Sequence, residues 1–168
     1  MIFISTGTTQ NPFERMDNLV QRISKALPRT KIVYQSVTTK LTSTKNVTIH
    51  GQLPYPKIVF NIRNSSQVIC HAGPATIFLS LVNNPKKPIV VPRVSRLGEH
   101  INDHQIHFAK YLEKNKLITL LPSENLEIYK IINSQSYHNY TSDSSHPKTL
   151  INNLKKYTKQ LRSTQTKL

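Results

Sequence analysis

The stretch Ile2–Leu27, IFISTGTTQNPFERMDNLVQRISKAL, decides the fold of this chain. It opens with a short run of β-favouring residues that ends at a cluster of turn formers, Ser5 to Thr9. A helix should follow, with Asn11 as its cap and Pro12 at its first position. One face of that helix is apolar at steps of three and four: Phe13, Met16, Leu19, Val20, Ile23 and Leu27. The stretch therefore predicts a strand, a small-residue loop and a helix in succession.

The same alternation continues to residue 121. Further strands are expected at Lys31–Tyr34, Val47–Ile49, Gln67–Cys70, Pro88–Val91 and Leu117–Leu121. Helices are expected at Pro56–Ile62, Ala75–Val82 and Asn102–Lys114. Strands that alternate with helices pair in parallel through right-handed crossovers. The pattern therefore predicts a three-layer α/β sandwich with a mostly parallel sheet.

The apolar core should end before the segment 133–147, NSQSYHNYTSDSSHP, which is almost devoid of apolar residues. We expect a single domain over residues 1–132, whose last helix runs from Ser123 to Ile132. Residues 133–147 should form a mobile linker. Residues 148–168 should form a basic C-terminal helix and tail.

The composition favours an anionic partner, because 23 Lys and Arg face 8 Asp and Glu and leave a formal charge of +15. Nucleic acid, a phospholipid surface and a phosphorylated metabolite all fit this charge, as does a solvated basic face without a ligand. Nucleic acid is the least favoured of the partners, because the basic residues are not interleaved with the aromatic side chains on which bases stack.

The location of the protein is predicted from its cysteine and its hydropathy pattern. The single cysteine, Cys70, lies in an apolar run and should be buried and inert, which favours a reducing compartment. No window has the roughly 20 apolar residues of a membrane helix, and the N-terminus does not read as a secretion signal. A cytoplasmic protein is expected.

Three loops should form the ligand crevice, because the carboxyl ends of parallel strands meet at one edge of the sheet. They are the first loop, Ser5–Gln10, the second loop, His71–Ala75, and the third loop, Arg93–Asp103. In the second loop, the amides of Ala75, Thr76 and Ile77 are suited to a diphosphate at a helix N-terminus. The alternative is a tight connection in which His71 is a satisfied core histidine.

The third loop carries the densest set of polar residues and runs into GEHINDHQ, residues 98–105. Arg93 and Arg96 are suited to phosphate, and the polar groups of Glu99, Asp103 and Gln105 to sugar hydroxyls. A polar helix start is one alternative. A metal site is another, because His100, Asp103 and His104 match an inverted zinc-protease motif in which Asp replaces Glu. The position of the motif in a loop after a strand disfavours the metal site.

On these residues the sequence resembles the C-terminal, nucleotide-sugar-binding domain of family 28 glycosyltransferases in its free-standing form. That form occurs in PssE-type exopolysaccharide transferases and in the catalytic subunit of the two-part dolichyl-diphosphate N-acetylglucosamine transferase. The motifs that carry the resemblance are IFISTGTTQNPFERM, VICHAGPATI and KKPIVVPRVSRLGEHINDHQ, in that order over residues 2–121.

The resemblance implies a Rossmann-like domain, the C-terminal half of a GT-B glycosyltransferase, that binds the donor for a membrane-anchored, acceptor-binding subunit. The reaction would invert the anomeric carbon and move a hexose or N-acetylhexosamine from a UDP-sugar to a polyprenyl-diphosphate-linked glycan, in exopolysaccharide or capsule synthesis. No metal or other cofactor would be needed. The protein would be recruited through its partner to the inner face of the plasma membrane.

The resemblance also assigns residues to the donor site, and the pKa range of histidine makes His100 our candidate for the general base. UDP would be held by Gly7, Thr8, Thr9, His71, Ala72, Gly73, Pro74, Ala75, Thr76 and Arg93. The donor sugar would lie near Glu99, Asp103, His104 and Gln105.

One position departs from the family pattern. Members of the family have Glu three positions after the Thr or Ser of the second loop, where it binds the ribose hydroxyls, whereas this chain has Leu79 three positions after Thr76. Three outcomes are open: Ser80 or Glu99 takes over this role, nucleotide binding is weakened, or the chain is a binding or regulatory subunit that has kept the fold without catalysis.

Overall fold

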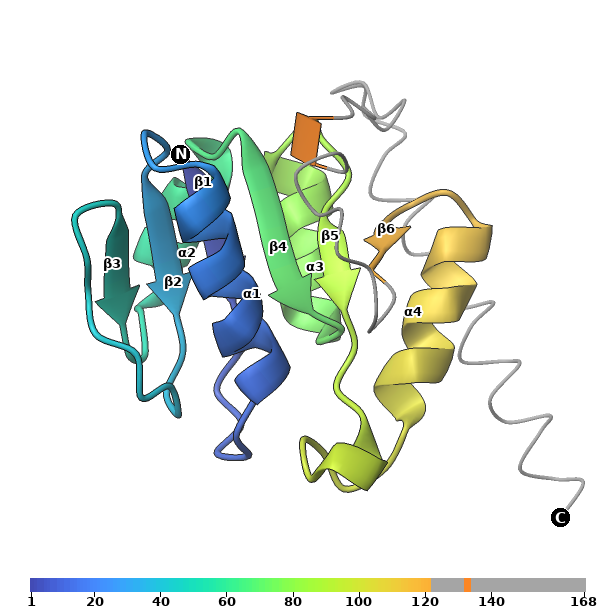
Figure 1. Ribbon diagram of the computed structural model, residues 1–168. Coiled ribbons are helices and arrows are strands. Elements are labelled where there is room, and N and C mark those ends of the chain that lie inside the picture. The colour runs from blue at the N-terminus through green and yellow to red at the C-terminus, as the bar shows by residue number, and fades with distance from the viewer. Residues whose placement is uncertain (122–131, 134–168) are drawn as a thin grey trace, which may run out of the picture. The chain divides into compact units, whose positions relative to one another are not determined.

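The computed structural model describes residues 1–121, 132 and 133, which all fall within one unit, Met1–His138. The strands are β1 (Ile2–Ser5), β2 (Ile32–Gln35), β3 (Val47–His50), β4 (Gln67–His71), β5 (Ile89–Val91) and β6 (Thr119–Leu120). The α-helices are α1 (Glu14–Ala26), α2 (Tyr55–Arg63), α3 (Pro74–Asn83) and α4 (His104–Lys114), with a 3-10 turn at Ser95–Leu97. The six strands form one parallel sheet in the order β3-β2-β1-β4-β5-β6 (Figure 1). The predicted α/β sandwich with a parallel sheet is confirmed.

The topology places a crevice between β1 and β4. The chain proceeds outward from β1 to β2 and β3, and then crosses back to lay β4 against the other side of β1. Loops that follow neighbouring strands on opposite sides of such a switch point diverge, and ligands of open α/β sheets bind between them. Here the two diverging loops are the first loop and the second loop.

Helices cover both faces of the sheet, with α1 in front and α2 and α3 behind in the view of Figure 1. The alternation of side chains along β1 decides which residues meet which layer. Ile2 and Ile4 pack with Met16 and other buried residues of α1, whereas Phe3 packs with Ile62 of α2 on the opposite face. Both faces of β1 are therefore buried, as expected of a central parallel strand.

Helix α1 begins at Glu14, two residues later than the sequence pattern indicates, and its start is not capped by Asn11. The main-chain carbonyls of Asn11 and Pro12 instead accept hydrogen bonds from Arg93, at 2.9 and 3.3 Å. The Asn11 side chain donates to the carbonyl of Gly98 at 3.2 Å. A tertiary contact thus replaces the local cap.

Helix α4 also begins two residues later than expected, at His104 rather than Asn102. The carboxylate of Asp103, the N-cap residue, accepts the backbone N–H of Ser95 at 2.7 Å and makes no capping bond. The Asp103 side chain therefore stabilises the 3-10 turn instead of capping α4.

Helix α3 ends in an extended residue, Asn84. Asn84 has φ −135° and ψ 132°, an extended conformation that Pro85 favours in the residue before it. Its buried side-chain amide donates to the carbonyls of Ile62 and Ser65, both at 2.8 Å. Asn84 therefore ties the end of α3 to the end of α2.

Few of the expectations for the C-terminal part fall on described residues. Ile132, the last residue of the helix expected from Ser123, is helical and 8% exposed, and it packs into the core. The rest of that helix, the linker beyond Asn133 and the basic helix lie outside the described residues. Within the described part of the chain, no helix has the length and apolarity to cross a membrane.

Candidate functional site

A pocket of about 350 Å³ lies at the carboxyl ends of β1 and β4. The first and second loops, with the start of α3, line it with Ser5, Gly7, Thr8, Thr9, His71, Gly73, Pro74, Ala75 and Thr76. The large apolar side chains of the lining, which we call the apolar wall, are Leu53, Tyr55, Ile58 and Leu79. Gln35 at the end of β2 completes the lining. No Asp, Glu, Lys or Arg is among these residues.

Gln35 fixes the shape of the first loop. It accepts a hydrogen bond from the Ser5 hydroxyl at 2.6 Å and donates one to the carbonyl of Gly7 at 2.9 Å. Gly7 has φ +75°, a conformation that glycine adopts at little cost. Gln35 is not among the predicted site residues. It could have been predicted from its position as a polar residue at the end of a buried parallel strand, because such a side chain needs a hydrogen-bond partner at the loop edge.

The ring of His71 lies between the two glycines that shape the pocket. A Cβ atom on Gly7 would come within 2.6 Å of the imidazole Cε1, and one on Gly73 within 2.1 Å of Nε2. Both distances are far inside van der Waals contact. The ring therefore requires glycine on both sides, and it joins the first loop to the second.

His71 is neutral at physiological pH. The pKa of its imidazole is lowered to about 4, mainly by burial and also by the nearby Arg93 guanidinium, while a backbone hydrogen bond with Ser5 acts in the opposite direction. Its Nδ1 has no hydrogen-bond partner. An uncharged ring thus lies at the base of the pocket.

Helix α3 points its N-terminus into the pocket. Gly73 is the N-cap, and Pro74 at the first position has no N–H to donate. The amide of Ile77, which was expected to face the diphosphate, instead donates to the carbonyl of Gly73 at 3.2 Å. The amides of Ala75 and Thr76 are therefore the ones that the helix leaves for a ligand.

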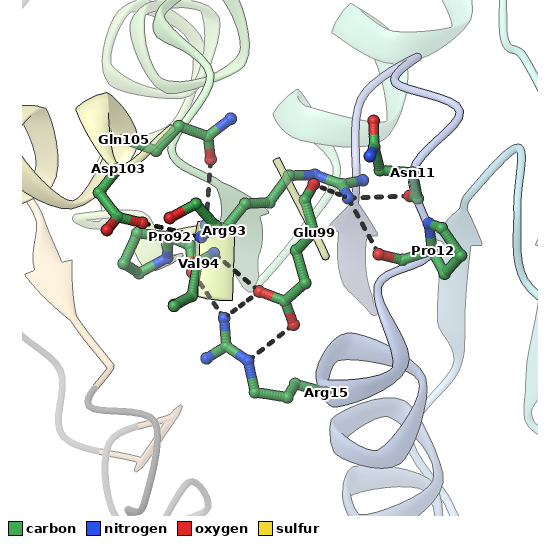
Figure 2. Close-up of polar contacts among 10 residues, drawn as sticks. Asn11, Pro12, Arg15, Pro92, Arg93, Val94, Glu99, Asp103 and Gln105 are labelled. Atoms are coloured by element: carbon green, nitrogen blue, oxygen red, sulfur yellow. Dashed lines mark hydrogen bonds and ion pairs between the residues drawn. The ribbon is translucent and has the colours of Figure 1, made fainter. Parts of the chain in front are cut away.

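Arg93 is fully buried, and its guanidinium binds main-chain carbonyls from three segments. Figure 2 shows its bonds to Asn11, Pro12 and Glu99. Its Nη2 donates to Thr6 at 3.1 Å, and its Nη1 donates to Glu99 at 3.1 Å and to the residues that precede α1. The guanidinium carbon lies 4.5 Å from the ring centroid of Phe13. This geometry does not support the expected contact with a diphosphate, because both terminal nitrogens of Arg93 donate to carbonyls within the fold.

Glu99 is also used within the fold (Figure 2). Its carboxylate accepts hydrogen bonds from Arg15 Nε at 2.8 Å and Nη2 at 2.5 Å. It also accepts one from the backbone N–H of Val94 at 2.8 Å. It is 4% exposed, so its oxygens are not offered to a sugar. The expected sugar contact is not supported here either. We call Arg93, Glu99 and Arg15, with the backbone groups they bind, the Arg93 network.

The other expected sugar ligands lie on the third loop and α4, and none lines the pocket. The buried Gln105 accepts the backbone N–H of Arg93 at 3.1 Å. The bond from the Ser95 backbone lowers the pKa of Asp103 below its ordinary value. The rings of His100 and His104 meet edge to face, with centroids 4.7 Å apart, and burial lowers the pKa of His104.

The structure thus gathers the predicted residues of the first and second loops around one pocket, apart from the fully buried Ala72. The third loop lies beside the first loop and holds it in place. Within residues 1–121, 132 and 133, no three His, Cys, Asp or Glu side chains are gathered in an arrangement that fits a metal ion.

Replacement of Arg93 by methionine should lower the free energy of unfolding by about 3 kcal/mol or more, because the buried main-chain carbonyls that it binds, among them those of Thr6 and Glu99, lose their partner. Urea denaturation measures this loss. Arg96→Met is the matched control, since Arg96 is exposed in the same loop, and it should change stability by less than about 0.5 kcal/mol. Equal effects of the two substitutions would contradict the structural role of Arg93.

The neutral His71 should make stability depend on pH. The unfolded chain binds a proton at this ring near pH 6.5 and the folded protein only near pH 4, so the free energy of unfolding should fall as the pH drops through this window. Between pH 7 and 4.5 the wild type should lose about 2 kcal/mol more than His71→Asn. Replacement of the exposed His50 by asparagine should leave the wild-type dependence unchanged. An equal loss in all three proteins would sink this account of His71.

The match with a known family covers almost the whole sequence. A search of curated proteins found no match. A family model, the glycosyltransferase family 28 C-terminal domain, matches residues 1–162. The resemblance expected from the sequence motifs is thereby confirmed at the level of the family, and the six-stranded parallel sheet agrees with its Rossmann-like fold. With a pocket at the switch point and a match of this extent, the chain belongs to glycosyltransferase family 28, as a copy of its C-terminal domain.

Proposed function

We propose that this chain is the donor-binding, catalytic subunit of a two-component glycosyltransferase. It takes a hexose or N-acetylhexosamine from a UDP-sugar and transfers it to a polyprenyl-diphosphate-linked glycan, in exopolysaccharide or capsule synthesis. The observation that carries the proposal is the pocket between the first and second loops, into which α3 directs the free amides of Ala75 and Thr76. The family match supports a glycosyltransferase function.

The diphosphate of the donor binds at the N-terminus of α3. Ala75 and Thr76 donate their amides, and the Thr76 hydroxyl is a further donor on the pocket surface. Gly7 and Gly73 allow the backbone to approach the phosphates closely. Since none of the described residues that line the pocket carries a cationic side chain, the positive end of the helix dipole is the main stabiliser of the departing diphosphate, without a metal ion.

The donor sugar extends toward the third loop. Glu99 and Gln105 serve the fold, which leaves Asp103, His104 and the half-buried His100 as the polar groups of our proposed sugar site. Inversion requires a base for the acceptor hydroxyl. His100 is our candidate because an imidazole accepts a proton near neutral pH, and a group of the second subunit is the alternative.

Two features support a membrane-anchored second subunit that supplies the acceptor site. Leu97 and Ile101 are 52% and 86% exposed on the third loop, and exposed aliphatic side chains near a site are typical of protein contacts. The net charge of +15 favours binding to an anionic membrane surface. On this proposal, the partner recruits the chain to the inner face of the plasma membrane.

Leu79 supports a second candidate function, a binding or regulatory subunit without catalysis. It lies in the pocket where the family has its ribose-binding Glu, and none of the described residues that line the pocket is a carboxylate. The Ser80 hydroxyl is fully buried and donates to the carbonyl of Thr76 at 2.8 Å. The carboxylate of Glu99 is held by Arg15. On this alternative the chain binds nucleotide weakly or not at all.

Calorimetry with UDP distinguishes the two candidates. The wild type should bind UDP with a micromolar dissociation constant, and Gly73→Asp should abolish binding, because its side chain collides with His71 and adds negative charge beside the phosphates. Gly51→Asp is the matched control, since an added Cβ there meets nothing within 4 Å, and it should bind like the wild type. Absence of UDP binding by the wild type would favour the non-catalytic subunit.

Turnover tests the two-component assignment. The chain should release UDP from a UDP-sugar in the presence of a lipid-linked sugar only when it is co-expressed with its membrane subunit. Gly73→Asp should lower this rate by about a hundredfold or more, as expected for loss of a helix N-terminus that stabilises a departing anion. If no nucleotide sugar supports turnover in the assembled pair, the enzymatic proposal fails.

A further inference from the structure

The geometry of α3 relates the phosphate end of the pocket to its nucleoside end. Thr76 and Leu79 both line the pocket and lie three residues apart on one face of the helix. This spacing is about 4.5 Å along the helix axis. A diphosphate at the amides of Ala75 and Thr76 therefore brings the pentose ring joined to it, one C5′–O bond away, alongside Leu79.

The surroundings of Leu79 are mainly aliphatic. Leu79, Leu53 and Ile58 pack on the core beneath the pocket, against Phe3 and Ile62. Tyr55 is 64% exposed. None of the described lining residues is a carboxylate, in contrast to a site built for vicinal hydroxyls.

Three polar side chains of the pocket are engaged by the loops. The Ser5 hydroxyl and both ends of the Gln35 amide are bonded within the first loop. The ring of His71 is enclosed between Gly7 and Gly73. A pentose alongside Leu79 therefore contacts the apolar wall.

We propose that Leu79 makes the pocket indifferent to the 2′-hydroxyl of the donor nucleotide, so that 2′-deoxyribonucleoside diphosphates bind as well as ribonucleoside diphosphates. The donor class then includes sugars activated by deoxythymidine diphosphate as well as UDP-sugars. The proposal rests on the proposed function, because it assumes that a nucleotide diphosphate binds at α3.

The physical reason is the cost of an unpaired hydroxyl. A pocket that hydrogen-bonds a hydroxyl rejects the analogue without it, because its own polar groups lose their partner. A leucine has no such group to lose. A 2′-hydroxyl on the apolar wall instead gives up water without replacement, which favours the deoxy ring or leaves the two rings equal.

The test compares UDP with 2′-deoxyuridine diphosphate, which differ only in the 2′-oxygen, on the wild-type protein by calorimetry. UDP should bind less than about fivefold more tightly, fivefold being the worth of one net hydrogen bond. A larger preference for UDP overturns the inference and leaves the proposed donor pocket in place. If neither nucleotide binds, the inference and the proposed donor pocket both fall.

A variant pair tests the role of Leu79 itself. Leu79→Glu supplies an acceptor and should raise the preference for UDP over the deoxy analogue to about tenfold or more, as a hydrogen bond to a charged group does. Val82→Glu places the same carboxylate one turn further along α3, where the side chain is 65% exposed and outside the pocket lining, and should keep the wild-type ratio. An unchanged ratio in folded Leu79→Glu removes Leu79 from the proposal, and Leu79→Gln provides a smaller perturbation should the charged variant fail to fold.

Discussion

The site depends on the buried guanidinium of Arg93. A charge taken out of water is costly unless every donor finds an acceptor of matching geometry. Arg93 offsets much of this cost through its two terminal nitrogens, which donate to the main-chain carbonyls of Thr6, Asn11, Pro12 and Glu99. Its guanidinium carbon lies over the ring of Phe13, while its Nε has no partner among the described residues. Because the first loop, the start of α1 and the third loop all bind one rigid planar group, their relative positions are fixed. The first loop, which lines the pocket, is therefore held in a fixed position.

The sheet could be predicted from the sequence because its signals are local. Pro88–Val91 is a short apolar run bounded by prolines, which is typical of a strand buried on both faces, and it forms β5. The pocket loops were predictable for the same reason, since small residues between a strand and a helix mark the ligand edge of a parallel sheet.

The roles of the third-loop residues could not be predicted, because they depend on partners far along the chain. Arg93 and Glu99 are residue types that bind phosphates and sugars, and composition alone does not reveal whether a ligand or a carbonyl takes their bonds. The partners are Asn11 and Arg15, more than eighty positions away. The late start of α1 has the same origin, since the Arg93 network uses the carbonyls before it. These contacts could not be predicted because the partners lie far apart in the sequence, not because the sequence pattern is weak.

The neutral lining of the pocket has a consequence for the catalytic cycle under the proposed function. A nucleoside diphosphate carries more negative charge than the nucleotide sugar from which it came. A pocket lined with lysine or arginine would hold the spent nucleotide more tightly than the fresh donor, and departure of the product would slow each round. Fixed amide dipoles and hydroxyl groups do not gain from that extra charge as a full cation does. The uncharged pocket therefore favours rapid exchange of product for donor.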